Sequence, residues 1–317
     1  MTESLMSAVA AFLAHKRALG RKYRSEEATL RLLVAFAADH GVDLVDQLHA
    51  ELLDAFVASR PRPRPRSFNQ LVGIVGCFLD WAVAQQLLAA SPLRTTRRRE
   101  TASYIPFLFD AVQARQLLDG AAALPDNSRA TGRGTTYHAL FALCYGLGLR
   151  AGEVCGLRLG DIDAGRGLLV VRGGKFGKSR LVPHGPRMAE LVAGQAERIG
   201  GPDDAPLFSF DGRHCVNPGT ASQVFRRLVV DLDFPIPAGV STPRLHCLRH
   251  SFAVGCLLRW YRDGLDPSAR LYDLSTFMGH VDPTSTQIYL TITAELLDEA
   301  NQRYEAFTQP AWSEAKP

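Results

Sequence analysis

The stretch that decides the fold is GLGLRAGEVCGLRLGDIDAGRGLLVVRGGKFGKSRLVPH, residues 146–184. Its glycine-rich start interrupts a helical pattern, and Arg150 then begins a short helix. Farther along, the apolar, β-branched runs 168–172 and 180–184 flank a segment of glycine and lysine, which is typical of a β-hairpin. Lys175 then lies at the hairpin tip. The stretch therefore predicts a domain that mixes helices with a small antiparallel sheet.

Helical patterns surround this stretch from Phe107 onward. Asp110 is a good N-cap, and Pro186 and Pro218 suit the first turn of a helix. Apolar residues recur at helical spacing after each of them. The expected helices cover residues 110–122, 135–147, 186–199, 217–229, 243–264, 274–278, 286–290 and 294–307. We therefore expect one α+β domain over residues 107–317.

Residues 1–90 predict a separate domain of four short amphipathic helices. Ser25 can cap the second helix, and Gly41 can end it. The apolar positions at helical spacing include Leu5, Val9, Phe12, Leu30, Leu33, Leu48, Leu52, Phe56, Phe68, Leu71, Val75 and Phe78. Four helices of this kind form a small bundle, so the whole chain is predicted to be mainly α.

Two arginine-rich segments flank the fourth helix. RPRPRPR (60–66) alternates Arg with Pro, which holds the backbone extended. Such a rod fits a phosphate backbone or a minor groove, and it serves equally well as a solvated connector. SPLRTTRRRETASYIP (91–106) lacks apolar periodicity and predicts an interdomain linker. Arg97, Arg98 and Arg99 within it can touch phosphates in passing.

The composition is that of an ordinary globular protein. Hydrophobic residues make up 46% and charged residues 21% of the 317 positions, which argues against a mostly disordered chain. We see no apolar run approaching the ~20 residues that span a bilayer, and no basic region before the first apolar stretch. We therefore expect neither a membrane partner nor a signal peptide. The six cysteines form no CxxC pair, which favours reduced thiols in the cytoplasm.

The positive charge is concentrated at the N-terminal end. Residues 1–106 hold 14 basic and 10 acidic residues, whereas residues 107–317 hold 22 of each. Of the 36 basic residues, 31 are arginine, whose planar fork suits phosphate. An arginine-rich composition is equally expected from a GC-rich genome. The charge therefore permits a polyanionic partner without requiring one.

The segment RGGKFGKSR (172–180) partly matches a phosphate-binding loop. The pattern GxxxxGK[ST] aligns with Gly177, Lys178 and Ser179 but requires glycine where this chain has Arg172. The segment also lies between two predicted strands, whereas a phosphate-binding loop joins a strand to a helix. Nucleotide hydrolysis is therefore disfavoured, and we expect no nucleotide cofactor.

The spacing of His246 and His250 resembles the first part of a zinc-protease motif. That motif needs Glu directly after the first histidine, where this chain has Cys247. Arg249 shares the helical face and is a poor neighbour for a dication. His280 would be the third ligand of such a site. We therefore expect no metal.

A different chemistry uses polar residues from four separated segments. Arginines and a histidine can neutralise a pentavalent phosphorane, a tyrosine can attack phosphorus, and a lysine can protonate the leaving oxygen. The residues that form this candidate catalytic set are Arg150, Lys175, His246, Arg249, His280 and Tyr289. Together they predict phosphoryl transfer.

Four segments carrying these residues resemble the signature boxes of the tyrosine recombinases, the phage-integrase and Xer-type family. In chain order they are GLRAGEVCGLRLGDID (148–163), GGKFGKSRLVP (173–183), HCLRHSFA (246–253) and MGHVDPTSTQIYL (278–290). Tyr289 lies nine residues after His280, as in the family pattern. The resemblance implies a catalytic domain from about residue 107. It also implies that residues 1–90 form a SAM-like core-binding domain.

The resemblance also implies roles for the residues that contact the phosphate. Arg150 and Arg249 would clamp the scissile phosphate, and His280 would hydrogen-bond a non-bridging oxygen. His246 would accept the proton of Tyr289 or hold the phosphate, depending on the step. Glu153 and His250 would be structural, Glu153 by bracing the region around Arg150.

The implied reaction is strand exchange through a covalent intermediate. Tyr289 would attack to leave a 3′-phosphotyrosyl link, and Lys175 would protonate the departing 5′-oxygen, with no metal or other cofactor. The implied partners are double-stranded DNA and other protomers, as a homotetramer on DNA or a hetero-oligomer with related recombinases. Residues 294–307 would pack on a neighbouring protomer. We expect a cytoplasmic, nucleoid-associated enzyme.

One departure from compact Xer-type proteins concerns the distance between two boxes. Residues 260–270 lengthen the segment between His246 and His280. This extension resembles recombinases of transposon-like elements, including those encoded in tandem groups. Two other functions remain open at this stage: a non-catalytic DNA-binding accessory subunit, and topoisomerase-like relaxation by the same chemistry.

Overall fold

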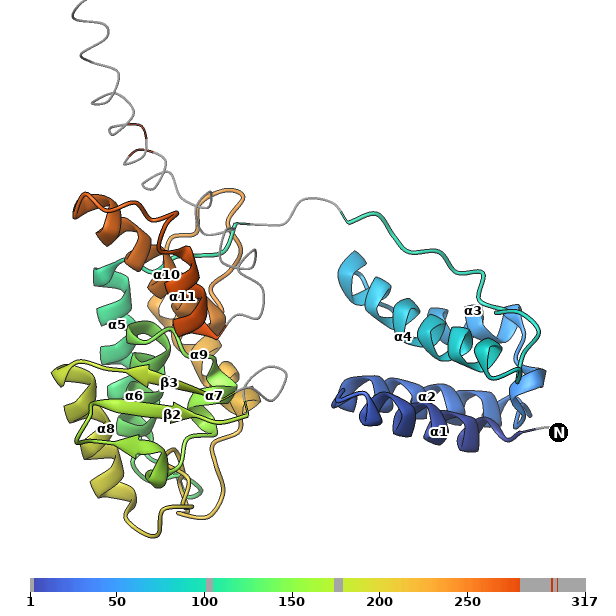
Figure 1. Ribbon diagram of the computed structural model, residues 1–317, viewed down its shortest axis with the longest axis horizontal. Helices are drawn as coiled ribbons and strands as arrows, with labels where there is room; N and C mark the ends of the chain where they lie inside the picture. The colour runs from blue at the N-terminus through green and yellow to red at the C-terminus, as the bar shows by residue number, and fades with distance from the viewer. Residues whose placement is uncertain (1–2, 101–104, 174–178, 280–297, 299–300, 302–317) are drawn as a thin grey trace, which may run out of the picture. The chain divides into compact units, whose positions relative to one another are not determined.

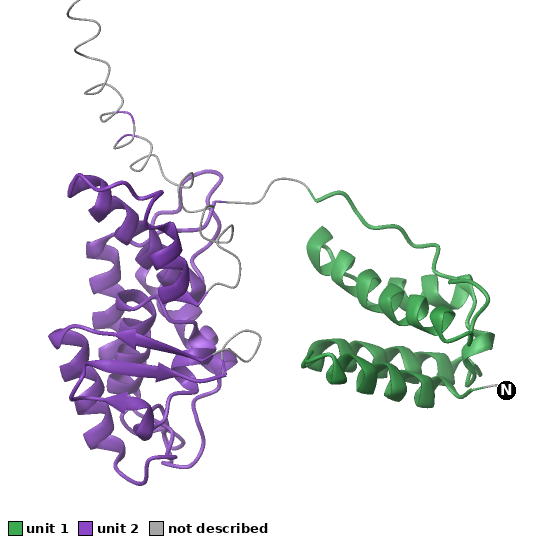
Figure 2. Cartoon of the chain, in the orientation of Figure 1, with its two compact units in different colours: residues 1–103 green, residues 104–317 purple. Residues whose placement is uncertain are grey.

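The computed structural model describes residues 3–100, 105–173, 179–279, 298 and 301. The chain divides into two compact units, residues 1–103 and residues 104–317 (Figure 2). The division falls inside the segment 91–106 that the sequence predicts as a linker. Among its described residues, the fold is mainly helical with a small antiparallel sheet, which confirms the predicted fold class.

The described part of unit 1 is built from α-helices that pack against one another (Figure 1). They are α1 (Leu5–Ala18), α2 (Arg24–Asp39), α3 (Ala50–Ala58) and α4 (Pro65–Ala84), with a 3₁₀ turn, η1 (Val45–Gln47), before α3. Their apolar faces meet in one core, where Phe12 packs edge-on against Phe78 with ring centroids 5.7 Å apart. The predicted apolar positions supply this core because local periodicity dictates which face of each helix turns inward.

The start of α2 differs from the sequence prediction. Ser25 lies in the first turn rather than at the N-cap, and its hydroxyl donates to the Glu26 carboxylate. Tyr23 occupies the N-cap in a left-handed conformation (φ 46°) and makes no side-chain cap hydrogen bond. The prediction of Ser25 as the cap is therefore wrong. The helix nevertheless holds because Leu30, Leu33 and Ala37 bury its apolar face.

Helix α4 begins inside the Arg/Pro segment. Pro65 takes the first helical position, which suits its fixed φ and missing N–H, so Arg66 is helical and the extended part stops at Arg64. The helix has 20 residues and, by length and composition alone, is long and apolar enough to cross a membrane. No such run was expected from the sequence. Its buried residues, such as Val75 and Phe78, form the core of unit 1.

Unit 2 is built around a central helix, α6 (Arg133–Gly146), most of which is buried. The other long helices are α5 (Ala111–Ala122), α8 (Pro186–Ile199), α9 (Pro218–Leu232), α10 (Leu245–Arg262) and α11 (Leu271–Met278). Helix α6 packs against α5, α8 and α10 (Figure 1). Asp110 caps α5 by accepting hydrogen bonds from two backbone N–H groups, as predicted. Helix α10 begins at Leu245 rather than at the predicted Pro243.

The remaining elements of unit 2 come from the stretch 146–184. They are α7 (Ala151–Cys155), the 3₁₀ turn η2 (Leu159–Asp161), β1 (Ile162–Asp163), β2 (Leu168–Val171) and β3 (Arg180–Pro183). The predicted hairpin is present as the antiparallel pair β2 and β3. Strand β1 pairs with β2 and was not predicted, because two residues carry no periodic signal. The helices predicted at 286–290 and 294–307 lie outside the described part of the chain.

Candidate active site

The glycine-rich break places Arg150 at the N-cap of α7. Gly148 takes a left-handed conformation (φ +60°), and a Cβ there would lie 2.3 Å from the Phe252 ring. Glycine alone combines this backbone conformation with so close an approach. The carbonyl of Gly148 accepts a hydrogen bond from Arg249 Nη1. The break thus brings the start of α7 against α10.

Arg249 is the most deeply buried charged side chain of the site. It is 1% exposed, and its Nη2 donates to the carbonyl of Met278 over 2.7 Å. Together with the bond to Gly148, this links α10 both to the loop before α7 and to the end of α11. A buried guanidinium needs such partners because an unsatisfied charged group in the interior is very costly. Arg249 is therefore fixed in position by the fold.

Arg150 meets Arg249 at the same carbonyl group. Arg150 Nη1 lies 3.5 Å from the Met278 oxygen, and Nη2 donates to the Gly279 oxygen over 3.1 Å. Arg150 Nη1 also donates to Glu153 Oε1 at 2.6 Å. The structure thus brings together two candidate residues that are 99 positions apart in the sequence. Arg150 keeps 24% of its side chain exposed, so it faces solvent where Arg249 does not.

His246 lies one helical turn before Arg249 on α10. As a residue it is exposed, while its ring packs edge-on against that of His250, with centroids 4.7 Å apart. Loss of solvent around the ring, followed by the positive charges of Arg249 and Arg150, lowers the pKa of His246 to about 4. The imidazole is therefore neutral at pH 7 and can accept a proton.

The other three candidates, Lys175, His280 and Tyr289, lie outside the described residues. The described chain leads to two of them at known points. Gly173 N donates to Ser179 Oγ at 3.3 Å across the base of the hairpin that contains Lys175. Gly279, in a left-handed conformation (φ +66°), ends α11 directly before His280. The segments that carry these residues thus depart from the neighbourhood of β3 and α11, which contact each other.

Arg180 is a further functional candidate, which was not predicted from the sequence. It is the first residue of β3, and its guanidinium bonds both oxygens of Glu153 at 3.0 Å. Its Nε also donates to the carbonyl of Phe277 at 2.9 Å, and its side chain is only 13% exposed. No sequence signal marks this position, because Leu181 and Val182 are both apolar and only the structure shows that Arg180 shares a strand face with the buried Val182.

Glu153 lies between the two arginines and is ionised. Its side chain is 6% exposed, and burial alone would raise its pKa. The hydrogen bonds and charges of Arg180 and Arg150 outweigh burial and lower the pKa of Glu153 to about 2. Three arginines and one carboxylate leave the site with an excess of positive charge around a neutral histidine. Such an arrangement can bind an anion such as a phosphate diester.

A metal site is not evident in the part of the chain that the structure describes. No three His, Cys, Asp or Glu side chains gather there closely enough to hold an ion.

Unit 1 carries a second candidate surface, formed by the two arginine-rich segments. Arg98 Nη1 donates to the carbonyl of Arg62 at 3.0 Å, and its guanidinium lies 3.7 Å from the centroid of the Phe68 ring. The backbone of Arg98 exchanges hydrogen bonds of 2.7 and 2.8 Å with the Asn69 side chain. Segments about thirty residues apart in sequence thus form one basic surface.

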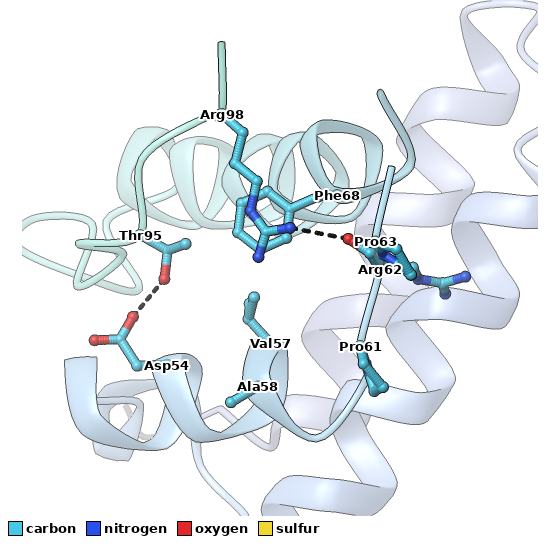
Figure 3. Close-up of a pocket in the computed structure, with 9 residues that line it drawn as sticks. All are labelled: Asp54, Val57, Ala58, Pro61, Arg62, Pro63, Phe68, Thr95 and Arg98. Atoms are coloured by element: carbon cyan, nitrogen blue, oxygen red, sulfur yellow. Dashed lines mark hydrogen bonds between the residues drawn. The ribbon is translucent and has the colours of Figure 1, made fainter. Parts of the chain in front are cut away.

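This surface borders a cavity of about 470 Å³, drawn in Figure 3. Val57 and Phe68 supply apolar walls, and the Thr95 hydroxyl donates to the Asp54 carboxylate on one side. The guanidinium of Arg98 lies flat over the Phe68 ring and reaches toward Arg62 (Figure 3). The segment that follows α4 therefore packs on unit 1 through hydrogen bonds and a cation–π contact at least as far as Arg98.

The fold and the basic site define a protein of a known class. The model of the phage integrase family matches residues 109–295, more than half of the chain. The chain belongs to this family of tyrosine recombinases.

Two curated relatives match nearly the whole chain. The integrase/recombinase y4rB of Sinorhizobium fredii is 33% identical over 310 residues, which cover 94% of this chain and 96% of that protein. The tyrosine recombinase XerC of Rhodospirillum centenum is 32% identical over 296 residues, which cover 90% and 82% respectively. The similarity therefore extends through both units.

Solved structures show the same fold. A Tn1549 transposon integrase in complex with a circular intermediate DNA superposes with a TM-score of 0.64 at 17% identity, covering 96% of this chain and 99% of that chain. A lambda integrase dimer bound to a core site gives a TM-score of 0.63 at 17% identity, covering 91% and 77%. At this identity, the likeness concerns the fold.

Proposed function

We propose that the protein is a site-specific recombinase that cuts and rejoins duplex DNA through a covalent tyrosyl intermediate. The observation that carries this proposal is the meeting of Arg150 and Arg249 at the Met278 carbonyl, with the neutral His246 one turn away. Arg150 comes from the first of the four family boxes, and His246 and Arg249 come from the third. Their convergence forms a cationic site directly before His280 in the chain.

The proposed reaction exchanges one phosphate ester for another. The Tyr289 oxygen attacks the scissile phosphorus and forms a 3′-phosphotyrosyl bond, while the bond to the 5′-oxygen breaks. His246 takes the phenolic proton, and Lys175 gives a proton to the departing 5′-oxygen. Religation reverses each transfer with a 5′-hydroxyl from the partner duplex. The reaction needs no external energy source because the phosphotyrosyl ester conserves the bond energy.

The phosphate would be held by the arginines and a histidine. Arg150 and Arg249 would each turn donors toward its non-bridging oxygens, with His280 as a third donor. The negative charge that develops in the transition state is then stabilised by groups whose positions the fold has already set. The pKa of about 4 for His246 refers to the site without an anion. A bound phosphate would raise this pKa and favour proton transfer to the imidazole.

The DNA is proposed to contact both units, and strand exchange is proposed to proceed through a Holliday junction. The two matched solved structures named above are integrases bound to DNA, one of them as a dimer. We infer a tetramer on DNA for this chain, composed of one protein or of related recombinases.

The transposon origin of one structural relative supports a mobile element as the substrate. A protein with this role works in the cytoplasm at the nucleoid.

A suicide substrate tests the proposal. A duplex from the DNA that flanks the gene, nicked close to the cleavage point, lets the short 5′-fragment diffuse away and traps the adduct. The wild-type protein should form a covalent protein–DNA complex that resists denaturation, and Tyr289→Phe should form none. Tyr272→Phe removes the hydroxyl of a tyrosine in α11 that is 71% exposed, and it serves as the matched control. An adduct that survives Tyr289→Phe would contradict the assignment of the nucleophile.

The same experiment decides between catalysis and an accessory role. A wild-type protein that binds the duplex but forms no adduct under any condition would be a DNA-binding subunit. Relaxation of supercoiled DNA that lacks a specific site would instead indicate a topoisomerase-like activity.

A further inference from the structure

The C-terminal end of α11 is capped by arginine side chains from three other elements. Three successive carbonyls there, at residues 277, 278 and 279, accept hydrogen bonds from Arg180, Arg249 and Arg150. The last carbonyls of a helix lack intrahelical partners and carry partial negative charge. Guanidinium groups satisfy both needs. The donors lie on β3, on α10 and at the N-cap of α7, so three separate parts of unit 2 bind the end of α11.

The Arg180 side chain makes three hydrogen bonds in this cluster, as many as the Arg150 side chain. It joins two partners at once, because Nη1 and Nη2 bond the two oxygens of Glu153 while Nε bonds the carbonyl of Phe277. Glu153 in turn holds the Arg150 guanidinium at 2.6 Å. Arg180 is thus connected to Arg150 through one shared carboxylate.

The backbone next to His280 fits closely around Arg180. A Cβ on Gly279 would lie 2.8 Å from Arg180 Nη1 and 3.0 Å from its Cζ, and Gly279 has φ +66°. Glycine at this position therefore allows both the left-handed turn and the close approach of the guanidinium. Contact with the arginine fixes where α11 ends and hence the point from which the chain continues to His280.

We propose that Arg180 is a positioning residue for strand cleavage, which holds Arg150 in its phosphate-binding position and fixes the turn before His280. This inference rests on the proposed function. Arg180 is five residues after Lys175 and begins β3. The strand that follows the segment with Lys175 is therefore joined to Glu153 and to the end of α11. In this proposal Arg180 acts through Glu153 and the end of α11, to which it is hydrogen-bonded, rather than by binding the DNA itself.

The planar guanidinium group of Arg180 makes Arg180→Lys the most informative variant for testing this proposal. Lysine keeps the positive charge, but a single ammonium group cannot bond both Glu153 oxygens and the Phe277 carbonyl in the same geometry. We expect the single-turnover cleavage rate at saturating DNA to fall by up to about 100-fold, as for other displacements of catalytic groups by about 1 Å. The dissociation constant for DNA should stay within about twofold, because most of the affinity comes from phosphate contacts elsewhere.

A double-mutant cycle separates positioning from simple packing. Arg180→Gln leaves the Glu153 carboxylate bonded to Arg150, and Glu153→Gln leaves two arginines side by side without their shared carboxylate. The double variant removes both charges together. Its loss in cleavage rate should be clearly smaller than the product of the two single losses, because the pair acts as a unit. Independent losses that multiply would overturn the proposal.

Arg166→Lys is the matched control. Arg166 also bonds a carboxylate in unit 2, with its Nε 2.7 Å from Asp163, but its side chain is 72% exposed. Its cleavage rate should equal that of the wild type. An Arg180→Lys protein that cleaves at the wild-type rate would overturn the inference. So would one that loses DNA binding and cleavage in parallel, since Arg180 would then merely hold the fold.

The wild-type adduct keeps this test distinct from that of the proposed function. If the wild-type protein forms no covalent complex, the proposed function fails, and no Arg180 variant is needed to show it. If the wild type forms the complex and Arg180→Lys slows it with unchanged binding, both proposals hold. Normal cleavage by Arg180→Lys leaves the proposed function intact and removes the positioning role alone.

Discussion

The arginines of unit 1 and those of unit 2 differ in how the fold treats them. Arg62 and Arg98 are exposed on unit 1, and each keeps its charge in contact with water. Arg249 is 1% exposed in unit 2, and Arg150 and Arg180 are mostly covered. The same side chain thus provides a diffuse basic surface in one unit and fixed hydrogen-bond donors in the other. Composition cannot distinguish these two uses, but burial does.

This contrast has a physical consequence for function. Exposed charges contribute to DNA affinity in a way that salt screens, and the loss of one should matter little. Buried donors aimed at a small site contribute to the transition state, where the loss of one matters greatly. Substitutions in the two units should therefore separate into effects on binding and effects on chemistry.

The largest effect is expected at Arg249. Arg249→Lys cannot donate to both Gly148 and Met278 in the native geometry, so the cleavage rate should fall by about 10³-fold. The free energy of unfolding should also fall by roughly 2 kcal/mol, because a buried charge-assisted hydrogen bond is lost. Adduct formation and chemical denaturation measure the two quantities. Arg259→Lys, on the exposed side of the same helix, should change neither. If Arg249→Lys cleaves DNA at the wild-type rate, the buried arginines of unit 2 do not differ in function from the exposed arginines of unit 1.

Arg150 should show a large effect on rate with a smaller one on stability. Its side chain is 24% exposed, so Arg150→Lys leaves the ammonium group in contact with water. The cleavage rate should fall by about 100-fold, because lysine cannot donate to both the Glu153 carboxylate and the Gly279 carbonyl as Arg150 does. The thermal unfolding midpoint should change less than in Arg249→Lys. A destabilisation equal to that of Arg249→Lys would show that burial does not separate the two arginines.

The sequence predicted the elements of the fold better than the contacts between them. Caps such as Asp110 and the prolines at helix starts act within one turn, so a local pattern is sufficient to recognise them. Ser25 failed as a cap because the N-cap lies earlier in the chain, at Tyr23, and tertiary packing stabilises the helix from there. Strand β1 is too short to carry a pattern.

The same reasoning explains what was missed at the candidate site. The sequence indicated Arg150 and Arg249 through their motifs, and the structure places them at one carbonyl. Arg180 escaped notice because its partners, Glu153 and Phe277, are 27 and 97 positions away. Only the folded arrangement of β3, α7 and α11 shows that they meet. The assignments of Lys175, His280 and Tyr289 remain predictions.

Acid should lower the stability of unit 2 by protonating Glu153, which pairs with Arg150 and Arg180. The pKa of Glu153 is lowered to about 2 in the folded protein, below its value in the unfolded chain. The resulting stabilisation is fully present above about pH 4.5 and is lost as the pH falls toward 2, for a total of roughly 3 kcal/mol.

Unfolding free energies measured across this pH range test the point. Glu153→Gln should lose this part of the pH dependence, whereas Glu51→Gln should keep it, because Glu51 is 72% exposed in its pair with Arg94. An identical pH profile for the wild type and Glu153→Gln would show that the carboxylate is not held by its arginines.

The smallest effect is expected on unit 1, and it sharpens the contrast most directly. Arg98→Gln removes one exposed charge and the contact that ties the segment after α4 to Phe68 and Arg62. DNA affinity should fall severalfold. For each DNA phosphate that the variant no longer binds, the slope of log affinity against log salt should become less steep by about 0.9. The cleavage rate at saturating DNA should not change, since no donor of the unit 2 site is affected.

Arg31→Gln removes the same charge from another surface of unit 1, where Arg31 is 75% exposed and pairs with Glu27. If the basic surface around Arg98 binds the phosphate backbone, Arg31→Gln should leave both the affinity and the salt slope nearly as they are in the wild type. Equal losses in the two variants would mean that net charge, rather than the joined arginine segments, determines binding by unit 1. A reduced cleavage rate in Arg98→Gln at saturating DNA would mean that exposed and buried arginines do not divide binding from chemistry, because an exposed one would then contribute to the chemical step.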